Sequence, residues 1–128
     1  MKGYYIDLEE ATKENNNFRK VLFTSGHLQL VLMTLQPGDE IGLETHKDHD
    51  QFIRVEAGEG KALINDDEFF LRDGSAVVIP AGNEHNIINI GTESLKLYTL
   101  YSPAEHPDGT VHMTKSEADE YEKLHHDE

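Results

Sequence analysis

Apolar and polar residues alternate in short blocks along most of the chain. From residue 18 onward, runs of four to nine residues rich in Val, Ile, Leu and aromatic side chains are each stopped by Gly, Pro, Asn or Asp. This pattern is typical of β-strands separated by tight turns. The expected strands cover residues 18–23, 27–35, 40–46, 51–57, 60–65, 68–72, 76–79, 85–90 and 95–101.

The spacing between these runs leaves no room for crossover helices. The sheet is therefore expected to be mainly antiparallel and closed, as in a β-barrel or jelly roll. Residues 27–35 and 76–79 are apolar at odd and even positions alike, so both faces of these strands should be covered. A homodimer that packs sheet on sheet is the expected cover, and the N-terminal arm is the alternative for one strand.

Residues 7–17 predict a short polar helix that frays at three asparagines and acts as a lid or arm. Residues 102–110 form a Pro/Gly-rich loop. The predicted organisation is one all-β domain over residues 1–128, with the barrel at about 18–101 and a C-terminal loop and helix at 102–128.

The spacing of Thr114 and Glu117 is that of a capping box and predicts the start of the final helix. This helix should run to about His125. It is too polar to be core, so we expect it to pack Tyr121 and Leu124 on a barrel edge.

Composition supports one cytoplasmic domain. A chain of 128 residues with 37% apolar content suits a single core, and the absence of cysteine excludes disulfides and thiolate ligands. With 11 basic and 25 acidic residues the formal charge is −14, and the basic residues are scattered, so no nucleic-acid partner is expected. No apolar run could span a bilayer and the start, MKGYYIDLEE, lacks a signal-peptide core, so no membrane partner is expected.

Polar side chains gather at the ends of two expected strands. Glu44 and His46 are two residues apart and share a strand face, which points into the barrel if Thr45 points outward. The turn at residues 47–50 then returns the chain so that Gln51 begins the neighbouring strand nearby. Burying a carboxylate among imidazoles is costly unless the groups pair or bind a cation. A metal ion resolves this cost, and a purely structural ion pair is the alternative.

The spacing of these segments resembles the two signature motifs of the cupin family, over about residues 25–101. The second motif, Gly-x5-Pro-x-Gly-x2-His-x3-Asn, is matched at every fixed position. In the first, Gly-x5-His-x-His-x3–4-Glu-x6-Gly, Glu44 replaces the first histidine and Gln51 the glutamate. The matched positions are Gly38, His46, Gly58, Gly74, Pro80, Gly82, His85 and Asn89.

The resemblance implies a jelly-roll barrel, often dimeric, with one divalent transition metal per chain (Fe, Mn, Ni, Co or Zn). It implies Glu44, His46, Gln51 and His85 as ligands. Two imidazoles and one carboxylate form the donor set associated with non-haem Fe(II). Gln51 is either a fourth donor or a hydrogen-bond partner of a ligand.

Four further residues are candidates for acid–base chemistry. His49 lies in the turn after His46 and could act as a proton shuttle, although a solvated role is the commoner one for such a residue. Glu84 precedes His85 and is a candidate base. His106 and His112 flank a loop that could close over the barrel mouth. The other histidines, His27, His125 and His126, are expected at the surface.

Three functional classes follow for a small-molecule substrate. The favoured one is a metal-dependent isomerase-like enzyme acting on a sugar or hydroxy-carbonyl compound, as in the small cupins labelled mannose-6-phosphate-isomerase-like, which this chain resembles. The alternatives are an Fe(II) dioxygenase and a non-enzymatic ligand-binding module. A phosphorylated substrate would need cations at the mouth, where the first motif offers only Lys47 and Arg54, and strand alternation aims Arg54 outward.

Overall fold

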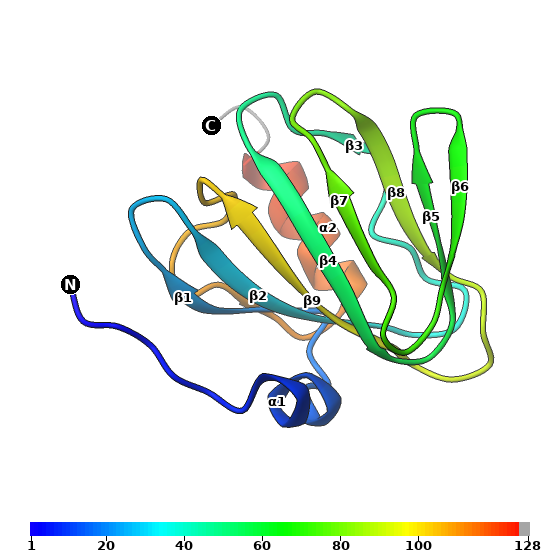
Figure 1. Ribbon diagram of the computed structural model, residues 1–128, viewed down its shortest axis with the longest axis horizontal. Helices are drawn as coiled ribbons and strands as arrows, with labels where there is room; N and C mark the ends of the chain where they lie inside the picture. Colours follow the sequence, from blue (N-terminus) through cyan, green and yellow to red (C-terminus); the bar gives the residue numbers. More distant parts are fainter. Residues whose placement is uncertain (126–128) are drawn as a thin grey trace.

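The computed structural model describes residues 1–125 and shows two β-sheets packed face to face (Figure 1). The larger sheet has the strand order β10-β1-β2-β9-β4-β7, and the smaller has the order β3-β8-β5-β6. The helices are α1 (Leu8–Glu14) and α2 (Lys115–His125). The strands are β1 (Arg19–Thr24), β2 (Gln29–Leu35), β3 (Glu44–Thr45), β4 (Asp50–Ala57), β5 (Gly60–Ile64), β6 (Asp67–Leu71), β7 (Ala76–Ile79), β8 (Glu84–Asn89), β9 (Leu95–Ser102) and β10 (Val111–His112).

The all-β jelly-roll prediction is confirmed, and most strand ends lie within two residues of their expected positions. The segment at 40–46 differs, since only Glu44–Thr45 is a strand and Glu40 makes an isolated bridge to Ile88. Gly42 between them has a φ of 113°, which an extended ladder does not accommodate. The strand β10 was not predicted because two residues carry no detectable alternation.

The inward-facing row of each long strand changes character along its length. In β9 the inward residues are Leu95 and Leu97, followed by Thr99 and Tyr101, and all four are buried. The register aligns Tyr101 with the inward glutamines of both neighbouring strands, Gln29 and Gln51. The sandwich therefore has an apolar end and a polar end, and the polar end forms a mouth.

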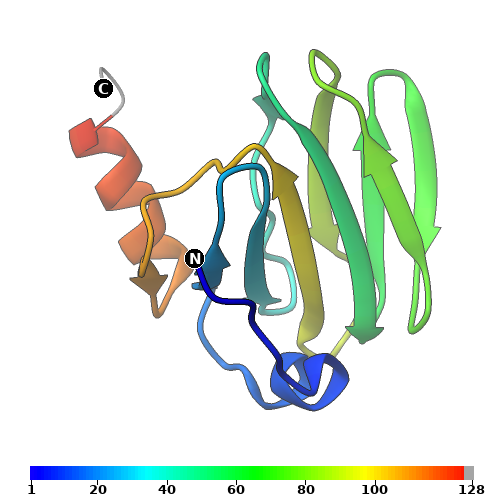
Figure 2. The ribbon, with the colours of Figure 1, turned by 60° about the vertical axis from the view of Figure 1, so that its left-hand side comes forward.

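The N-terminal arm covers the outer face of β2. Leu32 on that face is only 2% exposed, and the Thr34 hydroxyl donates to the Asn15 carbonyl at 2.7 Å. Tyr4 stacks on Phe23 with ring centroids 5.0 Å apart. Figure 2 shows α1 beneath one end of the larger sheet. The arm, the alternative to a dimer, thus accounts for the burial of Leu32, whereas Leu30 on the same face remains only half-buried.

The C-terminal helix begins where the capping box predicts, with the Glu117 amide donating to the Thr114 hydroxyl at 3.0 Å. Ala118 is buried against the core, and Tyr121 packs on His112 at a centroid distance of 5.1 Å. The expectation that Leu124 packs on the barrel edge is wrong, because this residue is 72% exposed where α2 runs away from β10 (Figure 2).

His126 lies outside the described residues, so the expectation for it stays untested. Within residues 1–125, neither helix has the length and apolar character that crossing a membrane requires.

Candidate metal centre

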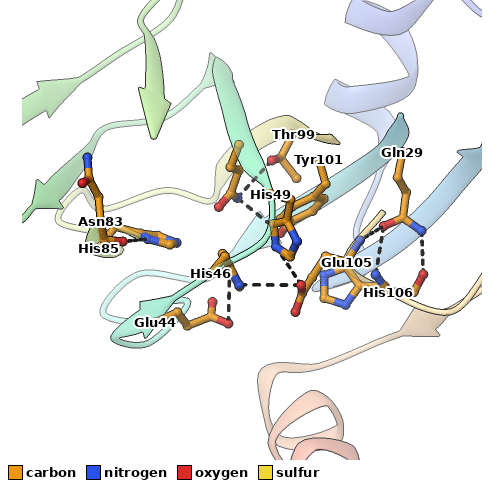
Figure 3. Close-up of polar contacts among 11 residues, drawn as sticks. Gln29, Glu44, His46, His49, Asn83, His85, Thr99, Tyr101, Glu105 and His106 are labelled. Atoms are coloured by element: carbon orange, nitrogen blue, oxygen red, sulfur yellow. Dashed lines mark hydrogen bonds and ion pairs between the residues drawn. The ribbon is translucent and has the colours of Figure 1, made fainter. Parts of the chain in front are cut away.

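The mouth of the barrel brings together two of the sequence-predicted ligands by direct strand pairing. Glu44 on β3 lies opposite His85 on β8 in an antiparallel register. His46 follows directly after β3 and shares its inward face with Glu44. One donor atom from each of Glu44, His46 and His85 lies within 4.8 Å of the others (Figure 3). This spacing is compatible with a single ion between them.

The two imidazoles present lone pairs toward this point. The His85 Nδ1 lies 3.0 Å from the Asn83 carbonyl, which can only accept, so Nδ1 carries the proton and Nε2 is free to ligate. Burial, together with the neighbouring His49 and His85, lowers the pKa of His46 to about 4. Burial raises the pKa of the Glu44 carboxyl to about 6, against the opposing effect of Arg19.

Orphaned polar atoms at the mouth fit a cation. Among the described residues, His46 Nε2 is buried without a hydrogen-bond partner and lies 3.8 Å from Glu44 Oε2. Gln51 Oε1 is likewise buried and has no hydrogen-bond partner in these residues. The amide nitrogen of the same side chain donates to the Thr99 hydroxyl at 3.0 Å and to the Tyr101 hydroxyl at 3.2 Å, which fixes the orientation of the amide. A divalent ion would satisfy such lone pairs, and the cluster of Glu44, His46 and His85 could hold one.

A second acidic group faces the same imidazole from the other side. Glu105 Oε2 lies 3.6 Å from His46 Nδ1 and 2.7 Å from His49 Nε2. Glu44 therefore faces one ring nitrogen of His46 and Glu105 faces the other (Figure 3). A carboxylate on the second nitrogen of a metal-binding histidine fixes the ring orientation and raises its basicity.

The solvated role favoured for His49 from the sequence does not match its placement. Its side chain is only 9% exposed and contacts Glu105 at the mouth. Burial lowers the pKa of His49. Burial and the nearby Glu44 raise the pKa of Glu105 to about 7. Sequence reasoning missed Glu105 because it lies in an irregular loop, where its only signal was the adjacent candidate His106.

A buried glutamine holds this loop over the mouth. The Gln29 side-chain oxygen accepts from the Glu105 amide at 3.1 Å and from the His106 amide at 3.0 Å. Its nitrogen donates to the His106 carbonyl at 2.7 Å and to the Thr24 hydroxyl at 2.9 Å. Because Gln29 is fully buried on β2, the loop that carries Glu105 is fixed by the barrel itself.

The two loop histidines have different surroundings. The His106 ring meets Tyr101 edge-on at 5.3 Å, and burial followed by Arg19 lowers its pKa to about 2, so it lines the mouth as a neutral imidazole. His112 belongs to β10, where its Nδ1 lies 3.4 Å from Arg19 Nη1 beneath α2. His112 is therefore outside the metal cluster.

The other candidate base points away from the site. Glu84 is exposed and precedes the inward-facing His85 on β8, so it lies on the outer face of the sheet. A role as a base inside the pocket does not fit this placement. Arg54 is on the outer face as expected, paired with Glu56 at 3.0 Å. The structure adds a cation that the sequence reasoning overlooked, since Arg19 on β1 is buried near the mouth.

Comparisons with known proteins show which family this chain resembles. The model of the Cupin domain matches residues 31–101. The chain is 46% identical to "Uncharacterized protein YrkC" of Bacillus subtilis (strain 168) over 91% of its own length and 66% of that protein, which is just under two thirds of the relative. It is 44% identical to "Uncharacterized protein L612" of Acanthamoeba polyphaga mimivirus, covering 90% of this chain and 74% of that protein.

Among solved structures, the BH2720 protein of Bacillus halodurans superimposes with a TM-score of 0.91 at 42% identity, covering 93% of this chain and 95% of the other. Cupins commonly bind a metal, and the histidine–glutamate cluster at this mouth could hold one. The matched domain spans more than half of the chain and includes all four predicted ligands, Glu44, His46, Gln51 and His85. The chain belongs to the cupin family.

Proposed function

We propose that this cupin binds one divalent transition metal per chain and acts on a small hydroxy-carbonyl compound, in the manner of an isomerase. The observation that carries the proposal is that a candidate metal cluster and a carboxylate–imidazole pair lie side by side at the mouth of the barrel. The cluster of Glu44, His46 and His85 could hold the ion, and Glu105 with His49 forms an acid–base pair on the far side of His46.

When bound, the metal would supply Lewis-acid polarisation of a carbonyl or hydroxyl oxygen of the substrate. The chain itself supplies the proton transfer. Glu105 Oε2 would accept a proton from a carbon next to the polarised oxygen, and His49 Nε2, 2.7 Å away, would take up that proton once the two groups are aligned. The Gln29 contacts hold Glu105 in place and keep the loop over the reacting groups.

The isomerase-like reaction can be measured as proton exchange. In deuterated water, the metal-loaded protein is expected to exchange the α-protons of hydroxyacetone, observed by NMR, without consuming oxygen. Glu105→Gln should lower this exchange at least about tenfold while the metal content stays at one per chain. Exchange that is equal in Glu105→Gln and wild type would exclude Glu105 as the base.

Metal binding is tested by elemental analysis after loading with Fe, Mn, Ni, Co or Zn. Wild type should retain about one ion per chain, and His85→Ala should retain none. His27→Ala is the matched control, because the His27 side chain is exposed and does not belong to the metal cluster. A wild type that takes up none of these metals would leave the cluster with a structural role only.

A second candidate function is an Fe(II) dioxygenase. The observation that favours it is the donor set, since two imidazoles and one carboxylate with open positions suit non-haem iron. Oxygen uptake by the Fe(II)-loaded protein with the same carbonyl substrate would support this candidate over proton exchange. If neither reaction occurs with the metal in place, the remaining possibility is a ligand-binding module without catalysis.

The homodimer also stands as a proposal, with a specific surface in support of it. Four apolar side chains, one from each of β2, β9, β4 and β7, form a cross-strand row on the outer face of the larger sheet. Val78 at the end of this row is 63% exposed. Light scattering should show a dimer in wild type and a monomer for Val78→Glu. The row is Leu30, Leu100, Phe52 and Val78.

A further inference from the structure

A cavity next to the metal cluster has no role in the function proposed so far. It has a volume of about 250 Å³ and lies between the start of β1, the segment before β3, and α2. Glu44 lines one wall of the cavity and also belongs to the metal cluster. A ligand that reaches the metal could therefore extend into this space.

Arg19 enters the same cavity as a buried cation. The residue is 7% exposed, and its Nε is buried with no hydrogen-bond partner among residues 1–125. Its one polar side-chain contact is from Nη1 to His112 Nδ1 at 3.4 Å. Burial and Arg19 itself lower the pKa of His112, so this partner is a neutral imidazole rather than an anion. A buried guanidinium without an anionic partner is costly, which makes the cavity a place where a bound anion would be stabilised.

The other charged groups around the cavity do not supply this anion. Glu44 belongs to the metal cluster and, within residues 1–125, makes no ion pair with Arg19. Lys115 Nζ is held by Asp119 at 2.6 Å, so these two residues neutralise each other. Glu122 is exposed at the rim, and in the part of the chain that the structure describes it makes no ion pair with Arg19. The remaining walls are apolar and are formed by Phe18, Ile41, Leu43 and Ala118.

We infer that Arg19 is the recognition residue for a carboxylate on the substrate, which makes the substrate class a small hydroxy- or oxo-acid. The inference rests on the proposed function, since the other end of this ligand would reach the metal cluster. A guanidinium binds a carboxylate through a fork of two parallel hydrogen bonds, so Arg19 suits a carboxylate that enters this cavity. An uncharged analogue would leave the buried fork unpaired and would be rejected.

A carboxylate fits the cavity better than a phosphate. The rim carries the carboxylate of Glu122, which repels a dianion more strongly than a monoanion. Arg19 is also the one guanidinium that lines the cavity, whereas a phosphate dianion is usually met by more than one unpaired cation.

The test compares three ligands that share a hydroxy-ketone and differ in charge. Hydroxyacetone is neutral, hydroxypyruvate adds a carboxylate, and dihydroxyacetone phosphate adds a phosphate. Calorimetry with the zinc-loaded full chain should show hydroxypyruvate binding at least about tenfold more tightly than either of the others. Equal affinities, or tighter binding of dihydroxyacetone phosphate, would overturn the carboxylate assignment.

Variants separate Arg19 from chelation of hydroxypyruvate by the metal. Arg19→Gln should bring hydroxypyruvate to within about twofold of hydroxyacetone, while zinc content and hydroxyacetone affinity stay unchanged. Arg72→Gln makes the same charge change at an exposed position, with the Arg72 amide bound to Ser75 near the opposite end of the barrel, and should change nothing. A preference for hydroxypyruvate that survives Arg19→Gln would overturn the inference.

Arg19→Lys keeps the charge and loses the fork, so it decides the matter if Arg19→Gln does not fold. This substitution should lower the affinity for hydroxypyruvate at least about threefold and leave the affinity for hydroxyacetone unchanged. An unchanged affinity for hydroxypyruvate, or an equal loss of affinity for both ligands, would count against the inference. The failures are distinguishable from each other. A protein that takes up no metal refutes the proposed function, whereas a metal-loaded protein that binds hydroxyacetone without a carboxylate preference refutes only the role of Arg19.

Discussion

The two ends of the barrel are built from the same strands in one continuous register, yet they have different physical roles. Along β9, Leu95 and Leu97 pack into the apolar end, and Thr99 and Tyr101 face the mouth. At the apolar end the buried side chains need only fill space. At the mouth they carry hydrogen-bonding atoms, several of which have no partner in the described residues. The comparison shows stability and chemistry placed in separate halves of one core.

The sharpest test of this separation is a pair of substitutions, one at each end. Leu97→Ala should lower the free energy of unfolding by about 2–5 kcal/mol, because it opens a cavity at a fully buried position, while the protein still binds one metal per chain. His46→Ala should reduce metal affinity at least about a hundredfold with a smaller loss of metal-free stability. Urea unfolding and metal titration of both variants measure the four quantities. Loss of metal binding in folded Leu97→Ala would show that the two ends are coupled.

The loop over the mouth offers a second way to test the comparison. Gln29→Leu should cost about 2 kcal/mol of stability, since the buried partners of its side chain lose their hydrogen bonds. The Glu105 and His106 amides should then exchange with solvent faster, whereas core amides such as that of Leu97 keep their relative protection. Hydrogen-exchange NMR reads both, and unchanged exchange at Glu105 would show that other contacts hold the loop.

Metal affinity should depend on pH through Glu44. In the metal-free protein the carboxyl has a pKa of about 6 because it is buried, so below that pH the ion must displace a proton. Through Glu44 the affinity for zinc is expected to rise about tenfold per pH unit below pH 6, whereas His46, with its pKa of about 4, is neutral over this range and adds no pH dependence. Chelator competition between pH 5 and 8 measures the curve. A flat curve would mean that Glu44 does not ligate.

The smallest effect is expected on the outer face. Glu84→Gln should leave metal affinity within about twofold and stability within about 0.5 kcal/mol, because this exposed side chain points away from the mouth. Metal titration and urea unfolding measure these two quantities. A large loss of α-proton exchange in this variant would restore Glu84 as a base and contradict its assignment to the outer face.

Most of the fold and part of the site followed from local pattern. Strand alternation predicted the bounds of β4, β5, β7 and β9 closely. The cupin-like spacing identified Glu44, His46 and His85, whose donor atoms lie within 4.8 Å of one another in the structure. The errors fell where a side chain's surroundings come from elsewhere in the chain. His49 seemed solvated because its turn is polar, but Glu105, more than fifty residues later, encloses it.

The sequence by itself determined the jelly roll and the spacing of the candidate ligands, because strand alternation has a period of two and turns have strong residue preferences. Only the tertiary structure decided that Glu105 faces His46 and that Arg19 lines a cavity beside Glu44. Both depend on how the C-terminal loop and α2 dock on the barrel. This docking brings together segments that are far apart in the sequence and share no periodic pattern, so it could not be predicted from the local sequence.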